Sequence, residues 1–108
     1  LTLAPNSSRL VRLLAWELAT APEKSLRDGA RALTMAQRLQ QAYPQDPRTI
    51  DGLAAALAES GDFARATSRG QSALELARRA GDLALARQIE LRLALYRRQQ
   101  PFHQPGQK

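Results

Sequence analysis

Apolar residues recur at intervals of three and four along most of the chain, and this spacing predicts amphipathic α-helices. Breaks fall at Pro22, at 43–47, at Gly61-Asp62 and at Gly81-Asp82. A proline pushes the preceding residue out of helical geometry, whereas Gly closes one helix and Asp caps the next. We therefore expect an extended lead-in over 1–6, then five helices at about 8–21, 26–42, 47–60, 63–78 and 83–98.

The apolar positions also indicate which face each helix buries. The expected faces are Leu10, Leu13, Leu14, Leu18 and Ala21 in the first helix; Gly29, Leu33, Ala36, Leu39 or Gln40, and Tyr43 in the second; Ile50, Leu53, Ala54 and Leu57 in the third; Phe63, Ala66, Gly70, Ala73 and Ala77 in the fourth; and Leu85, Ile89, Leu93 and Tyr96 in the fifth. Ser7 or Ser8 is expected to cap the first helix. Ser25 and Asp28 resemble a capping box for the second.

Composition supports helices that pack closely, because the chain holds 20 Ala and 18 Leu but only five aromatic residues. The absence of Cys excludes disulfides and thiolate metal sites. No apolar run is long enough for a membrane span and no signal peptide is visible, so no membrane contact is expected from this segment. The compartment stays open, with the cytoplasm slightly preferred.

The first and third helices share a pattern, as do the second and fourth. Leu14-Ala15-x-x-Leu18 matches Leu53-Ala54-x-x-Leu57, and Gly29-x(6)-Ala36 matches Ala66-x(6)-Ala73. Residues 47–78 resemble the tetratricopeptide repeat, whose 34 residues form a helix hairpin with large and small residues at these places. The 7–43 copy is longer, and its extra residues fall in the turns.

The resemblance implies an all-α fold of antiparallel helix hairpins, an α-solenoid, over residues 1–99. It would comprise a degenerate repeat at 7–43, the best repeat at 47–80 and a capping helix at 83–98 with a polar outer face that includes Arg92. A polar, Pro-containing tail follows at 100–108. Residues 10–98 are similar to the C-terminal repeats of longer bacterial tetratricopeptide proteins, and the first residue is Leu, so we expect a piece of a longer chain.

In such repeats the first helix of each pair lines a concave groove, so the resemblance implies candidate binding positions there. These are Arg9, Arg12, Leu13, Trp16, Arg48, Asp51, Gly52, Ala55 and Glu59. Trp16 is the only Trp and would be an interface anchor, or would pack under the 22–28 loop or an upstream repeat. Arg9 and Arg12 could hold a carboxylate. The clamp residues of chaperone-binding relatives are missing, because Leu13 stands where Asn is usual.

Catalysis is not expected, nor is a cofactor or a metal. Asp51 and Glu59 lie on one helical face, yet no nucleophile or metal partner accompanies them. His103 is the sole His and is expected to be a simple tail residue.

The sequence thus predicts a protein–protein interaction or scaffold module. Its partner would be a protein or peptide, upstream repeats of the same chain, or a second copy through the exposed N-terminal end. The alternative is a regulatory appendage of a larger enzyme, which includes the case of a membrane-bound one. The net charge of +6 also suggests a nucleic-acid binder. However, 14 of the 16 basic residues are Arg and Ala is abundant, which favours a GC-rich genome as the cause of the basic composition.

Overall fold

A computed structural model of the chain describes residues 5–106, and these form an all-α fold with no strand among them. The five helices are α1 (Pro5–Thr20), α2 (Gly29–Ala42), α3 (Pro47–Glu59), α4 (Phe63–Arg79) and α5 (Leu83–Arg97). A 3-10 turn, η1 (Lys24–Leu26), lies between α1 and α2. The predicted all-helical class is therefore confirmed. Most of the predicted lead-in, residues 1–4, lies outside the described residues, as do 107–108 of the tail.

Aspartate side chains cap four of the helices. Asp28, Asp46, Asp62 and Asp82 each accept a hydrogen bond from a backbone N–H two or three residues later. Gly61 and Gly81 have φ angles of 89° and 74°, which a residue without Cβ adopts at little cost. The predicted breaks at 43–47, 61–62 and 81–82 thus lie where the structure turns.

Two predicted helix starts are wrong. The second helix begins at Gly29 rather than Leu26, because Asp28 caps it and its own N–H is bound to the Leu18 carbonyl at 2.8 Å. The first helix already includes Pro5, so Ser8 lies inside it and does not cap it. The Ser8 hydroxyl instead lies 2.9 Å from the Tyr43 hydroxyl.

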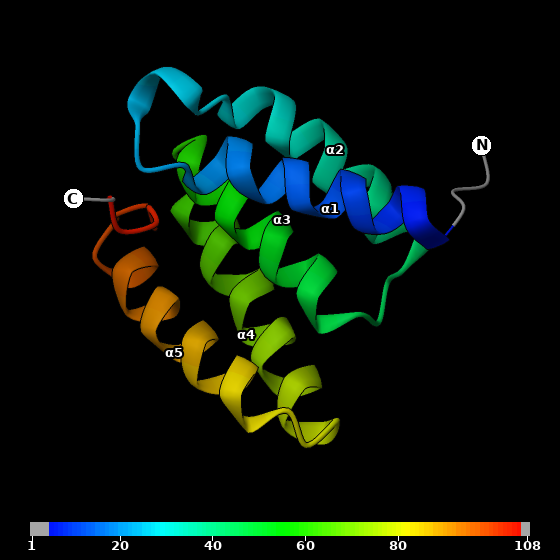
Figure 1. The fold of residues 1–108 in the computed structure, drawn as a ribbon. Helices are drawn as coiled ribbons and strands as arrows, with labels where there is room; N and C mark the ends of the chain where they lie inside the picture. Colours follow the sequence, from blue (N-terminus) through cyan, green and yellow to red (C-terminus); the bar gives the residue numbers. More distant parts are fainter. Residues whose placement is uncertain (1–4, 107–108) are drawn as a thin grey trace.

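Consecutive helices pack against one another, and α3 occupies the centre, where it contacts α1, α2 and α4 (Figure 1). Because it is covered on several sides, α3 is buried almost throughout from Thr49 to Ala58. The predicted face of α4 is confirmed at Ala66, Gly70, Ala73 and Ala77, all buried, and Phe63 is half-buried. The predicted α5 face at Leu85, Ile89, Leu93 and Tyr96 is also buried.

The predicted buried face of α1 is largely wrong. Leu10, Leu13 and Leu14 are 67%, 47% and 44% exposed, while Ala15 and Ala19 form the buried side. Small side chains allow α1 to approach its neighbours closely, and this turns the leucines outward. The interior is therefore built from alanines here, and the leucines form an exposed apolar face.

Candidate functional site

Helices α1, α3 and α5 together line a hollow of about 240 Å³, which we call the inner hollow. It is lined by Arg12, Leu13, Trp16, Arg48, Asp51, Gly52, Leu85, Gln88 and Arg92. Six of these residues were expected at a groove from the sequence. The other three come from α5, the helix that was expected only to cap the fold.

A buried ion pair forms the floor of this hollow. Arg92 donates to both carboxylate oxygens of Asp51, with Nε at 3.2 Å and an Nη at 2.5 Å. The side chains are only 8% and 7% exposed. Burial raises the pKa of the Asp51 carboxyl, and Arg92 opposes that rise. The sequence-based expectations of an open groove carboxylate at Asp51 and a solvated Arg92 are both wrong.

Trp16 is half-buried beside this pair, in a cluster of two aromatic rings and one guanidinium. The Arg92 guanidinium lies 4.9 Å from the Trp16 ring centroid and 5.3 Å from that of Phe102. The two rings are 5.9 Å apart and tilted by 36°. Trp16 therefore packs against a C-terminal side chain, Phe102, and against Arg92 of α5.

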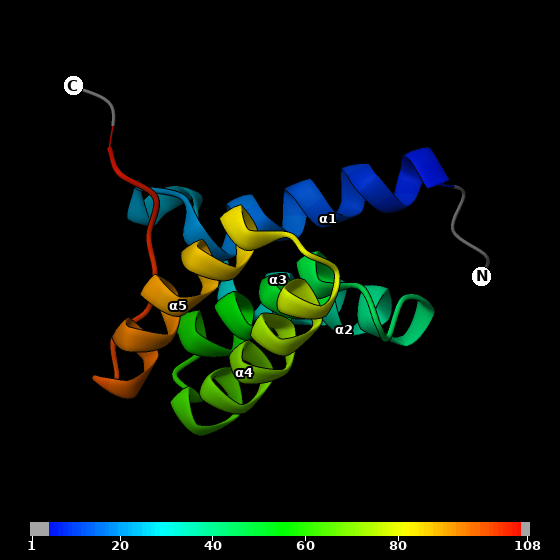
Figure 2. The same cartoon turned by 90° about the horizontal axis from the view of Figure 1, so that it is seen from below.

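The C-terminal segment, residues 101–106, runs back from the end of α5 to the end of α1 (Figure 2). The Gln104 backbone N–H donates to the Thr20 carbonyl at 2.7 Å. Its side-chain amide donates to Glu17 at 2.9 Å and to the Thr20 hydroxyl at 2.8 Å. The segment expected to be a simple polar tail is thus tied to the first helix.

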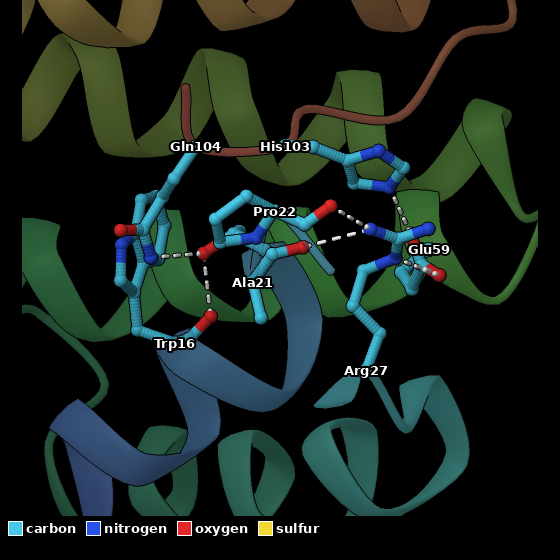
Figure 3. Close-up of polar contacts among 8 residues, drawn as sticks. Trp16, Ala21, Pro22, Arg27, Glu59, His103 and Gln104 are labelled. Atoms are coloured by element: carbon cyan, nitrogen blue, oxygen red, sulfur yellow. Dashed lines mark hydrogen bonds and ion pairs between the residues drawn. The ribbon is translucent and has the colours of Figure 1, made fainter. Parts of the chain in front are cut away.

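Glu59, at the end of α3, joins three parts of the chain (Figure 3). One carboxylate oxygen lies 2.7 Å from the His103 ring, and the other accepts from Arg27 at 3.2 Å. Arg27 also donates to the carbonyls of Ala21 and Pro22, at 2.7 and 3.2 Å. Glu59 is therefore a structural contact and not an open groove position, and His103 is more than a tail residue.

The remaining candidate groove residues lie in different places. Ala55 is 2% exposed and belongs to the core, so its assignment to a groove is wrong. Arg9 lines a different hollow, with Tyr43 and Asp46. Arg48 lies at the rim, 55% exposed, with a long contact of 3.4 Å to Asp82. No ion pair involves Arg12 within residues 5–106.

Sequence reasoning missed Arg92 and the C-terminal segment. The signal for Arg92 was present, because it follows Ile89 by three positions and so lies on the apolar face of α5. Phe102, an aromatic residue within a polar stretch, was a weaker signal. No local pattern indicates that Gln104 meets Thr20, which lies 84 positions earlier.

Asp51 and Glu59, the two carboxylates that were expected on one face of the third helix, both have basic partners. No group of His, Asp or Glu in the described part of the chain is suited to hold a metal ion. None of the described helices is long and apolar enough to cross a membrane. Comparisons with protein-family models, curated proteins and solved structures find no match.

Proposed function

We propose that this chain is a non-catalytic protein-interaction module of the tetratricopeptide kind, resembling the closing part of a longer repeat stack. Its binding surface is the face formed by α1, α3 and α5. One observation carries the proposal: this face already holds a peptide segment without regular secondary structure, residues 101–106 of the chain itself. The contacts made by that segment are the kind that a bound peptide makes.

The segment has two types of contact that together suit peptide recognition. A backbone N–H of Gln104 bonds to the end of α1, which fixes an extended chain without regard to sequence. Phe102 packs on Trp16 and Arg92, which selects an aromatic side chain at one position. Backbone bonds for affinity and a side-chain contact for specificity are typical of peptide-binding surfaces.

The segment is held weakly enough to be exchanged. Residues 101–104 are half-buried and 105–106 are exposed. Its polar side-chain contacts go to Thr20, Glu17 and Glu59. A handful of such bonds, each worth about 1 kcal/mol net, lets a competing peptide replace it.

The proposal is tested with the 108-residue chain carrying Phe102→Ala and Gln104→Ala, which loosens the segment without removing any residue. Trp16 is the only Trp, so its fluorescence reports directly on this contact. A synthetic peptide with the sequence of residues 99–106 is then titrated in. We expect the added peptide to restore the emission of the unsubstituted chain. A segment linked to the protein acts at an effective concentration of about millimolar, so the separate peptide should saturate in that range.

The matched control is the same peptide with Ala in place of its Phe. If both peptides change the emission equally, or neither does, the face does not bind extended peptides in this way and the proposal fails. Thermal melts of the substituted chain confirm beforehand that it remains folded.

A further inference from the structure

The inner hollow stays open beside the C-terminal segment, and its charge is unbalanced. Three arginines line it, at positions 12, 48 and 92, against the single carboxylate of Asp51. Arg92 already takes both oxygens of that carboxylate. The hollow therefore carries the positive charge of Arg12 and Arg48 without a free carboxylate among its lining residues.

Neither rim arginine has a strong partner. Arg12 has no ion pair within the described residues, and the Arg48–Asp82 contact is long, with side chains that are 55% and 33% exposed. An exposed contact of this kind contributes about 0–1 kcal/mol. Both guanidinium groups are therefore available to a ligand, and a guanidinium fork matches a carboxylate in shape as well as in charge.

The rest of the lining suits a polypeptide. Leu13, Trp16 and Leu85 supply apolar surface next to the two rim arginines. A Cβ added at Gly52 would meet no atom within 4 Å, so an incoming backbone can approach α3 closely there. A hollow of about 240 Å³ has room for one or two side chains of an extended chain.

We propose that the inner hollow binds an acidic side chain, Asp or Glu, of an extended peptide, with an apolar residue next to it. Arg12 and Arg48 hold the carboxylate, and Leu13, Trp16 and Leu85 contact the apolar neighbour. This inference rests on the proposed peptide-binding function and adds the chemistry of the partner. The occupant that we propose is therefore a peptide, and binding of a nucleic acid in its place is one of the outcomes that the test separates.

The test begins with an unbiased library. Random peptides are displayed on phage through their C-termini, so that only side-chain carboxylates are free, and are selected on the 108-residue chain. We expect enrichment of peptides with Asp or Glu beside an apolar residue. The best peptide is synthesised with its acid and with the amide equivalent, and both are titrated by calorimetry. Loss of the charge should weaken binding about tenfold or more, as expected for a charge-assisted bond.

Variants then locate the site. Arg12→Gln and Arg48→Gln should each weaken the acidic peptide about five- to tenfold and leave the amide peptide nearly unchanged. Arg38→Gln is the charge-matched control, because Arg38 is exposed on α2 and does not line the inner hollow. Thermal melts verify that all three variants fold.

The failures of the two proposals are distinguishable. If no peptide is enriched, both the peptide-binding function and this inference are wrong. If peptides are enriched without acidic residues, or if Arg38→Gln weakens binding as much as Arg12→Gln, only the inference is overturned. A random single-stranded DNA that binds more tightly than the acidic peptide and depends equally on Arg12 and Arg48 also overturns it.

Discussion

Removing one partner of the Asp51–Arg92 pair should destabilise the protein far more than a surface ion pair would. Asp51→Asn leaves a guanidinium that is about nine-tenths buried without its counter-charge. Breaking a buried pair in this way costs about 3–5 kcal/mol. A typical domain has a free energy of unfolding of about 5–15 kcal/mol, so the loss is a large part of the total.

Arg92 has a second role that makes the two single substitutions unequal. Its guanidinium also lies over Trp16 and Phe102, and each such contact is worth about 0.5–1 kcal/mol at partly exposed sites. Arg92→Met should therefore cost as much as Asp51→Asn, or slightly more. The double variant Asp51→Leu, Arg92→Met replaces the pair by apolar side chains, and we expect it to recover most of the lost stability.

Urea and thermal unfolding followed by circular dichroism measure this cycle. For a domain of this size, a loss of 3 kcal/mol lowers the Tm by about 12 °C or more. Single substitutions that each cost less than about 1 kcal/mol would mean that the pair behaves as an exposed one, and the reasoning would be refuted. A double variant as unstable as the sum of the two singles would refute it as well.

Three further substitutions test the packing. Ala66→Leu should lower the free energy of unfolding by about 1–3 kcal/mol because Ala66 is fully buried in a close helix contact. Ala64→Leu, at an exposed position, is the control, and equal melting temperatures for the two variants would contradict the assigned helix register. Tyr96→Phe should leave stability unchanged or raise it by about 1 kcal/mol, since the buried Tyr96 hydroxyl has no hydrogen-bond partner within residues 5–106. A marked loss of stability in chemical denaturation would show that the hydroxyl has a partner. Leu10→Ser with Leu14→Ser should lower self-association in sedimentation velocity without lowering the Tm, because both leucines are exposed. A monomer before and after the change would count against association through this face.

The fold was predictable to the extent that local chemistry determines it. Asp46, Asp62 and Asp82 cap where expected, since each follows a break and precedes an apolar period. The start of α2 was not predictable in the same way. Ser25 and Asp28 are both good caps by local rules, and the choice depends on a tertiary bond from Asp28 to Leu18.

Only part of the site was predictable from the sequence. Arg12, Trp16 and Arg48 meet at the inner hollow as the repeat pattern implies. The periodicity could not show that Asp51 is neutralised by a residue 41 positions later. Nor could it show that the leucines of α1 face outward, because Leu10, Leu14 and Leu18 recur every four residues, as do Ala15 and Ala19, and either set could be the buried one.

The C-terminal segment has a consequence for how the chain folds. In a stack of helical hairpins each unit contacts only its neighbours, and the ends can unravel independently. Here Gln104 reaches Thr20 across 84 positions, and His103 reaches Glu59 across 44. Contacts of such long sequence separation slow folding, because a large loop must close before they form. Because these bonds are few and partly exposed, the segment should open before the helices do, and the Gln104 amide hydrogen should exchange ahead of those in the buried helices.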